Sequence, residues 1–196
     1  MKVIGVTGGM ASGKSTVARL IARDQYPQLD ADELVHHLMA EDAETIAAIG
    51  QAFPTALVNG TISRAALSAL IAQGVEVVPT LETILHPRVR LAEERLIALA
   101  TRDGKDAVVM DIPLLFETGA EALCDHVIAV GAPLEMRRER AFARPGMTVE
   151  KWDKLIARQL TDEQRAAKAD AVIHTTGDMN HTRAQVSAIL AKWSIL

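Results

Sequence analysis

Residues 8–15 of the chain read Gly8-Gly9-Met10-Ala11-Ser12-Gly13-Lys14-Ser15, directly after the apolar run Val3-Ile4-Gly5-Val6-Thr7. They match the pattern G-x-x-x-x-G-K-[ST], in which a glycine-rich turn between a strand and a helix wraps its backbone N–H groups around a phosphate. Lys14 is expected to reach the β- and γ-phosphates, and Ser15 to offer its hydroxyl to Mg²⁺. The helix that continues through Thr16 directs its positive end at the same anion. The stretch therefore predicts a nucleoside triphosphate site.

Composition favours a compact enzyme. The chain has 196 residues, 49% of them hydrophobic, which is enough to bury a core in one or two domains. The formal net charge is -4 and aromatic residues make up 3% of the chain, so we expect neither a nucleic-acid partner nor a membrane surface. Cys124 is the single cysteine, which favours a reducing compartment. We expect a cytoplasmic enzyme whose oligomeric state is open, with a monomer favoured.

Short apolar runs that alternate with helical patterns predict the fold class. Besides residues 3–7, such runs occupy 107–110, 126–130 and 171–174 and are typical of strands buried on both faces. This alternation predicts a parallel sheet flanked by helices, with ligands at the carboxyl ends of the strands, where the glycine loop also lies. The last predicted helix has one apolar face, formed by Val186, Ile189, Leu190 and Trp193. The fold class is therefore α/β, with a P-loop nucleotide-binding core.

The strand pattern disappears between Asp32 and about Lys105, where the sequence predicts helices broken at turns such as Asn59-Gly60. Ser63 is a candidate N-cap, and Pro87 suits the first turn of a later helix. The apolar stripe of that later helix is formed by Val89, Ala92, Leu96 and Leu99. We assign residues 34–103 to a helical insertion that could hold a second substrate, and residues 1–33 and 104–196 to the core.

Residues 133–168 are rich in arginine and glutamate. Their thin apolar stripe consists of Met136, Phe142, Val149, Trp152 and Ile156. A solvated helical pair is one interpretation. The alternative is a mobile lid, because Arg137, Arg140 and Arg144 are three and four positions apart and would share a helix face. Closing over the nucleotide, they would exclude water and neutralise charge on the migrating phosphoryl group.

Carboxylates follow two of the predicted strands. Asp30-Ala31-Asp32 comes after a short apolar segment, so that at least one carboxylate should face the triphosphate. Asp32 is a candidate to accept the proton of the acceptor hydroxyl, and a helix N-cap is the alternative role, which Asp30 could also take. Asp111 directly follows the run 107–110. A carboxylate at this position lies near Mg²⁺ in many nucleotide-binding folds, and the alternative is that it only hydrogen-bonds the turn at the end of the strand.

The histidines predict no structural metal, because the adjacent His36 and His37 cannot face one ion from a helix as a spaced pair would. His86 precedes Pro87 at the predicted helix start, where it could meet a phosphate or cap the helix. The residues alone favour the cap.

Several separated segments together resemble the dephospho-coenzyme A kinase family. In chain order they are Val6-Thr7-Gly8-Gly9, Ser12-Gly13-Lys14-Ser15-Thr16, Asp30-Ala31-Asp32, Leu85-His86-Pro87, residues 111–117 (D-I-P-L-L-F-E), Arg140, Arg144, Gln159 and Ala169-Asp170-Ala171-Val172-Ile173. These segments span nearly the whole chain, and their order is specific where the glycine loop alone is not. Members of this family use ATP and Mg²⁺ to phosphorylate the ribose 3′-hydroxyl of dephospho-coenzyme A.

The resemblance implies a fold of the nucleoside monophosphate kinase type, in which the helical insertion holds dephospho-coenzyme A and residues 133–168 form the lid. It implies that Asp32 is the catalytic base, and that Arg140 and Arg144 act with Lys14 at the transferring phosphate.

The resemblance also implies that His86, Leu115 and Glu117 bind substrate. The sequence departs from the family at Ala11, where glycine is frequent. It departs again at His174-Thr175-Thr176-Gly177, which replaces the Asp-Asn-x-Gly usual near adenine.

Two other functions are compatible with the residues. One is another small-molecule or nucleoside monophosphate kinase on the same core. The other is a non-catalytic nucleotide switch, although the sequence contains no Asn/Thr-Lys-x-Asp motif for reading guanine and a switch has no use for a large acceptor domain.

Overall fold

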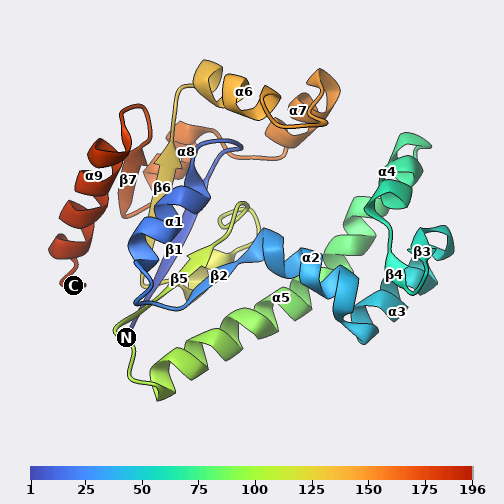
Figure 1. Cartoon of the computed structure of the whole chain (residues 1–196), viewed down its shortest axis with the longest axis horizontal. Coiled ribbons are helices and arrows are strands. Elements are labelled where there is room, and N and C mark those ends of the chain that lie inside the picture. The colour runs from blue at the N-terminus through green and yellow to red at the C-terminus, as the bar shows by residue number, and fades with distance from the viewer. Residues whose placement is uncertain (196) are drawn as a thin grey trace. The chain divides into compact units, whose positions relative to one another are not determined.

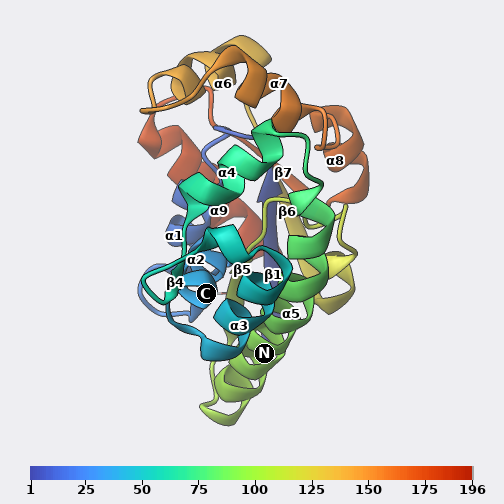
Figure 2. The ribbon, with the colours of Figure 1, turned by 90° about the vertical axis from the view of Figure 1, so that its right-hand side faces the viewer.

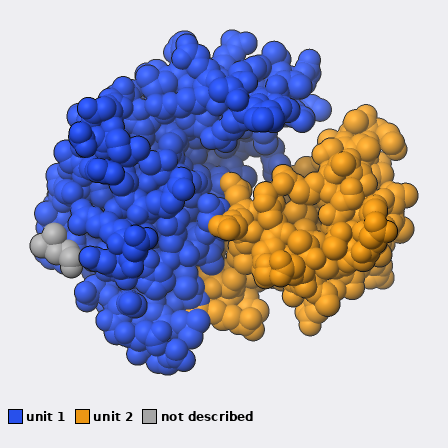
Figure 3. Space-filling view, in the orientation of Figure 1, with its two compact units in different colours: residues 1–30, 96–196 blue, residues 31–95 orange. Residues whose placement is uncertain are grey.

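The computed structural model describes residues 1–195, which form two compact units. Unit 1 holds residues 1–30 and the chain from Leu96 onward, and unit 2 holds residues 31–95 (Figure 3). The second boundary falls inside a long helix, α5 (Val77–Arg102), so one helix contributes residues to both units. None of the described helices has the length and apolar content that crossing a bilayer requires.

Unit 1 is built on a five-stranded parallel sheet with the strand order β2-β5-β1-β6-β7 (Figure 1). Its strands are β1 (Lys2–Gly8), β2 (Gln28–Asp30), β5 (Ala107–Asp111), β6 (His126–Gly131) and β7 (Ala171–His174). The four runs predicted as strands are confirmed, and both faces of β1 and β5 are buried, as their unbroken apolar sequences require. The sheet therefore matches the predicted fold class.

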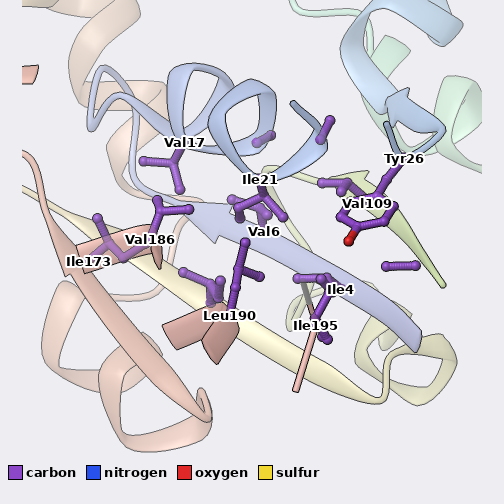
Figure 4. Packing of buried hydrophobic residues seen from close by; sticks show 14 of the residues in the cluster. Ile4, Val6, Val17, Ile21, Tyr26, Val109, Ile173, Val186, Leu190 and Ile195 are labelled. Carbon is purple, nitrogen blue, oxygen red and sulfur yellow. The ribbon is translucent and has the colours of Figure 1, made fainter. Parts of the chain in front are cut away.

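Helices α1 (Lys14–Ala22) and α9 (Met179–Lys192) pack on one face of this sheet. The core between them and the strands includes Ile4, Val6, Val17, Ile21, Val109, Ile173, Val186 and Leu190 (Figure 4). Ile189 and Trp193 pack against this cluster, and the Trp193 ring stacks on His126 with their centroids 4.3 Å apart. The predicted apolar face of the last helix is confirmed.

The charged region forms α6 (Leu134–Phe142), α7 (Val149–Ile156) and α8 (Asp162–Lys168). Ala141 and Trp152 are buried against Ala11 of the glycine loop. The predicted stripe is only partly confirmed, since Phe142 is 37% exposed and Val149 is 46% exposed. The packing of Ala141 and Trp152 on Ala11 anchors the region to the loop.

Unit 2 contains α2 (Ala31–Glu41), α3 (Ala43–Ala52), a 3₁₀ turn (Pro54–Ala56), β3 (Leu57–Val58), β4 (Thr61–Ile62), α4 (Arg64–Ala72) and most of α5 (Figure 2). These elements enclose their own apolar cluster, in which Met39, Ile49, Leu67 and Leu85 are buried. Ser63 caps α4 as predicted, because its hydroxyl accepts a hydrogen bond from the Ala66 N–H at 3.2 Å.

The expectation that unit 2 lacks strands is wrong, because β3 and β4 form an antiparallel hairpin around Asn59-Gly60. Both turn residues have positive φ, 50° at Asn59 and 81° at Gly60, as a type I′ turn requires. Strands of two residues are too short to show an alternating pattern, so only the Asn-Gly pair could have predicted the hairpin.

Pro87 lies inside α5 and does not begin it, which corrects the predicted helix start. Proline has no N–H, so position 87 donates no hydrogen bond to the Thr83 carbonyl, while the next carbonyl, of Ile84, accepts one from Arg88 Nη1 at 2.7 Å. The predicted stripe is also wrong at Leu99, which is 47% exposed. Ala100 is buried in its place.

Candidate active site

The glycine loop connects β1 to α1 in a conformation that only small residues allow. Gly13 has a φ of 91°, and Ala11, at 60°, also takes a left-handed value. A side chain on Gly8 would lie 2.6 Å from the Val130 carbonyl oxygen, so the loop can turn only if this residue is glycine. The turn closes through the Ser12 N–H, which donates to the Gly9 carbonyl at 3.0 Å.

Lys14 and Asp111 form a buried ion pair at the carboxyl end of the sheet. The Lys14 side chain is 10% exposed, and that of Asp111 is completely buried. Burial raises the pKa of Asp111, whereas the Lys14 ammonium and a hydrogen bond from Ser15 oppose this rise. Asp30 stands opposite Asp111 across the β2–β5 pairing, and its negative charge contributes to the raised pKa.

The oxygen atoms around this pair suit a small hard cation. Asp111 Oδ2 is buried and, within residues 1–195, has no hydrogen-bond partner. Ser15 supplies a hydroxyl at the Asp111 carboxylate. Mg²⁺ favours carboxylate and hydroxyl oxygens and usually takes its other ligands from water and phosphates. The residues therefore fit the ion that the sequence predicted at Ser15 and Asp111.

Arg140 is tied to the end of the glycine loop through Thr175. Its guanidinium donates to Thr175 Oγ1 at 3.0 Å and to the Thr175 carbonyl at 2.7 Å. The Thr175 hydroxyl in turn donates to the Ser12 carbonyl at 2.6 Å. Thr175, which departs from the family pattern, therefore lies directly on the loop.

Arg144 lies outside the helix that carries Arg140. Helix α6 ends at Phe142, so Arg144 follows the helix and is exposed. The expectation of three guanidinium groups on one helix face is therefore wrong for Arg144, because a shared face exists only while the helix continues.

Sequence reasoning missed Arg165, which lies beside Arg137 against Gly9. A side chain on Gly9 would lie 1.6 Å from Arg137 Nη1 and 3.4 Å from Arg165 Nη1. Burial lowers the pKa of Arg165, and the carboxylates of Asp162 and Glu117 oppose this effect. No helical pattern in the sequence distinguishes Arg165. Only the second glycine of the loop, Gly9, indicates that a bulky side chain packs against this position.

Gln159 and Glu117 hold the lid region to the core. Gln159 Oε1 accepts a hydrogen bond from the Met10 N–H at 3.0 Å, and Glu117 Oε1 accepts one from the Leu160 N–H at 2.9 Å. Glu117, expected to bind substrate, has this anchoring role here. Leu115 was also expected to bind substrate. It is completely buried against Gly5, so its side chain offers no surface to a substrate.

The remaining predicted residues belong to unit 2. Asp32 is exposed in the first turn of α2, which begins at Ala31, so Asp32 is not the N-cap. His86 is exposed in the interior of α5. The N-terminal roles predicted for His86 are therefore wrong, because α5 begins at Val77, well before His86.

Comparison with known proteins gives the same family as the motifs. A family model described as dephospho-CoA kinase matches residues 2–181. A dephospho-CoA kinase of Rhodopseudomonas palustris is 41% identical over 191 residues, which cover 97% of this chain and 95% of the relative.

Solved structures agree. The dephospho-CoA kinase of Campylobacter jejuni has a TM-score of 0.70 at 25% identity and covers 98% of this chain and 96% of its own. A shikimate kinase of Bacteroides thetaiotaomicron, at a TM-score of 0.53, 14% identity and 98% coverage of both chains, shares the fold alone. With this match over nearly its whole length and a phosphate loop built as its motif requires, the chain belongs to the dephospho-CoA kinase family.

Proposed function

We propose that this chain transfers the γ-phosphoryl group of ATP to the ribose 3′-hydroxyl of dephospho-coenzyme A. The 3′-oxygen forms a bond to the γ-phosphorus, the bond from that phosphorus to the β,γ-bridging oxygen breaks, and ADP leaves. The observation that supports this most is the buried group of Lys14, Ser15 and Asp111 at the glycine loop of a member of this family. We place the reaction in the cytoplasm, where the lone thiol of Cys124 would stay reduced.

The loop residues position the nucleotide. The backbone N–H groups of Ala11 and of residues 13–15, at the N-terminus of α1, would hold the β-phosphate. Lys14 would exchange Asp111 for the β- and γ-phosphates. Ser15 and Asp111 would hold Mg²⁺, which neutralises phosphate charge when it is bound. The exchange leaves Asp111 without its ammonium partner. Binding of a cation at Asp111 and binding of a phosphate at Lys14 would therefore strengthen one another.

Asp32 would accept the proton of the 3′-hydroxyl as its oxygen attacks. The support is its place in the chain, two residues after Asp30, the last residue of β2, and its exposed carboxylate. Arg140, already fixed beside the loop by Thr175, would neutralise charge on the transferring group. His86 and Arg144, both exposed, would contact dephospho-coenzyme A and the phosphates respectively.

An acceptor panel tests the proposal. Purified protein with ATP and Mg²⁺ is offered dephospho-coenzyme A, AMP, CMP, gluconate and shikimate, with Lys14→Ala as the inactive control. Dephospho-coenzyme A should be phosphorylated faster than the others by orders of magnitude. Faster phosphorylation of another acceptor would favour a different kinase on this core, and ATP hydrolysis with no phosphorylated acceptor would favour a nucleotide switch.

A further inference from the structure

Ala11 places an apolar side chain between the glycine loop and the helices α6 and α7, which lie over this loop (Figure 1). Ala11 is 8% exposed and forms a small cluster with Ala141 of α6 and Trp152 of α7, separate from the main apolar core of unit 1. Trp152 is the buried residue of α7, and Ala141 is completely buried in α6. The attachment of both helices therefore includes a methyl group that glycine, frequent at position 11 in the family, would lack.

The loop itself has no need of this methyl group. Ala11 has a φ of 60°, in the left-handed region, where a Cβ atom lowers the population of a conformation about 5- to 30-fold and glycine has no such penalty. The turn is closed elsewhere, by the hydrogen bond from the Ser12 N–H to the Gly9 carbonyl at 3.0 Å. The contact with α6 and α7 is thus what favours alanine at this position.

Helix α7 depends on the cluster because the helix is short. It has 8 residues, and isolated helices shorter than about 12 residues are marginal in water. Val149 and Leu155 of this helix are exposed, whereas Ile156 is partly buried and packs on the same cluster as Trp152. The packing that stabilises α7 is therefore concentrated at the cluster that Ala11 completes.

We propose that Ala11 is a positioning residue, whose methyl group holds α6 and α7 on the glycine loop and so fixes the backbone of Arg140 for phosphoryl transfer. Arg140 directly precedes Ala141 in α6, so the two residues move together. Thr175 holds the guanidinium end of Arg140, and the Ala11 cluster holds its backbone. The proposal rests on the proposed function in giving Arg140 its role at the transferring group.

Hydrogen exchange and urea unfolding of the whole chain test the contact without any substrate. Ala11→Gly removes the methyl group and keeps the backbone N–H. Amide exchange in α7, residues 149–156, should become about 4-fold faster, the equivalent of one buried methyl group at about 0.8 kcal/mol. The urea midpoint should stay close to that of wild type, because relief of the left-handed strain offsets both the lost burial and the greater freedom of glycine in the unfolded chain.

Ala107→Gly is the matched control. Ala107 is completely buried in the main core at the start of β5, so glycine there also removes one buried methyl group. This variant should lower the urea midpoint, and it should leave both the amide exchange of α7 and kcat unchanged. Unchanged α7 exchange in Ala11→Gly, or the same loss of global stability in both variants, would overturn the proposal.

Kinetics separate a positioning role from a structural one. With ATP and dephospho-coenzyme A, Ala11→Gly should lower kcat by about 2- to 4-fold and leave KM for ATP unchanged, because the loop keeps its N–H groups. In an Arg140→Ala background the same substitution should not lower kcat further, since the residue through which Ala11 acts is gone. Equal losses in both backgrounds, or a kcat equal to that of wild type, would overturn the positioning role. If the wild-type chain phosphorylates no dephospho-coenzyme A but Ala11→Gly exchanges faster in α7, only the proposed function is overturned.

Discussion

Replacing Lys14 with methionine leaves the carboxylate of Asp111 buried without its cation. Breaking a buried ion pair by removing one partner destabilises a protein by about 3–5 kcal/mol. Asp111 can limit this cost by taking up a proton, which from an ordinary pKa near 4 costs about 4 kcal/mol at pH 7. Because Ser15 continues to hydrogen-bond Asp111, we expect the lower part of this range, about 3 kcal/mol, or a fall in Tm of roughly 6–12 °C for a chain of this length.

The pH dependence identifies the cause. Burial already raises the pKa of Asp111, and removal of Lys14 raises it further, so the folded variant binds a proton that the unfolded chain releases. The loss of stability should therefore grow as the pH rises above the ordinary carboxyl pKa and shrink, by up to about 1.4 kcal/mol per pH unit, as the pH falls from 7 to 5.

Urea unfolding followed by tryptophan fluorescence measures this change, because both tryptophans, Trp152 and Trp193, lie in unit 1 with the ion pair. The double variant Lys14→Met/Asp111→Asn is the matched control and should recover most of the lost stability without recovering activity. A single variant within about 1 kcal/mol of wild type at pH 7, a loss that does not change with pH, or a double variant no more stable than the single one would contradict a buried ion pair at Lys14 and Asp111.

Other substitutions test the remaining assignments. Asp32→Asn should slow phosphoryl transfer by about 10²–10⁴-fold in rapid-quench kinetics while both substrates still bind, and near-normal transfer would remove Asp32 from the mechanism. Arg140→Ala should lower kcat more than it raises KM for dephospho-coenzyme A, because it removes a positive charge fixed at the loop. Arg144→Ala should also lower kcat more than it raises KM. A change in KM alone for either variant would show a binding role instead. Burial raises the pKa of Glu93, so Glu93→Gln should raise the free energy of unfolding by about 1 kcal/mol at pH 7, and the gain should disappear as the pH falls and Glu93 protonates. Arg90, its ion-pair partner 3.7 Å away, is 38% exposed and stays hydrated; a gain that persists at pH 4 in chemical unfolding would contradict the explanation.

The parts of the fold that the sequence predicted depend on local patterns. The apolar runs of β1, β5, β6 and β7 are continuous because both faces of the sheet are covered, and the glycine loop is defined by backbone conformations that side chains would block. Each of these patterns needs only neighbours in the chain to be recognised.

The parts that the sequence missed depend on partners distant in the chain. Gln159 bonds to Met10 across 149 positions, and Thr175 bonds to Ser12 across 163, which no local pattern records. Arg165 is separated in the same way from the loop that it faces. The prediction for Pro87 was wrong for another reason. Proline removes one hydrogen bond of a long helix, and the burial of Val77 and Leu85 in the core of unit 2 keeps α5 continuous where a local rule predicts its start.

Positional analysis of the product tests the proposed phosphoryl transfer most directly. The chain is given ATP labelled at the γ-phosphorus and dephospho-coenzyme A, and the labelled product is mapped by phosphorus NMR and mass spectrometry. We expect one ADP for each coenzyme A formed, the label only on the ribose 3′-oxygen, and no product with Lys14→Ala. Label on another oxygen, or ADP formed without a labelled acceptor, would contradict the proposed transfer.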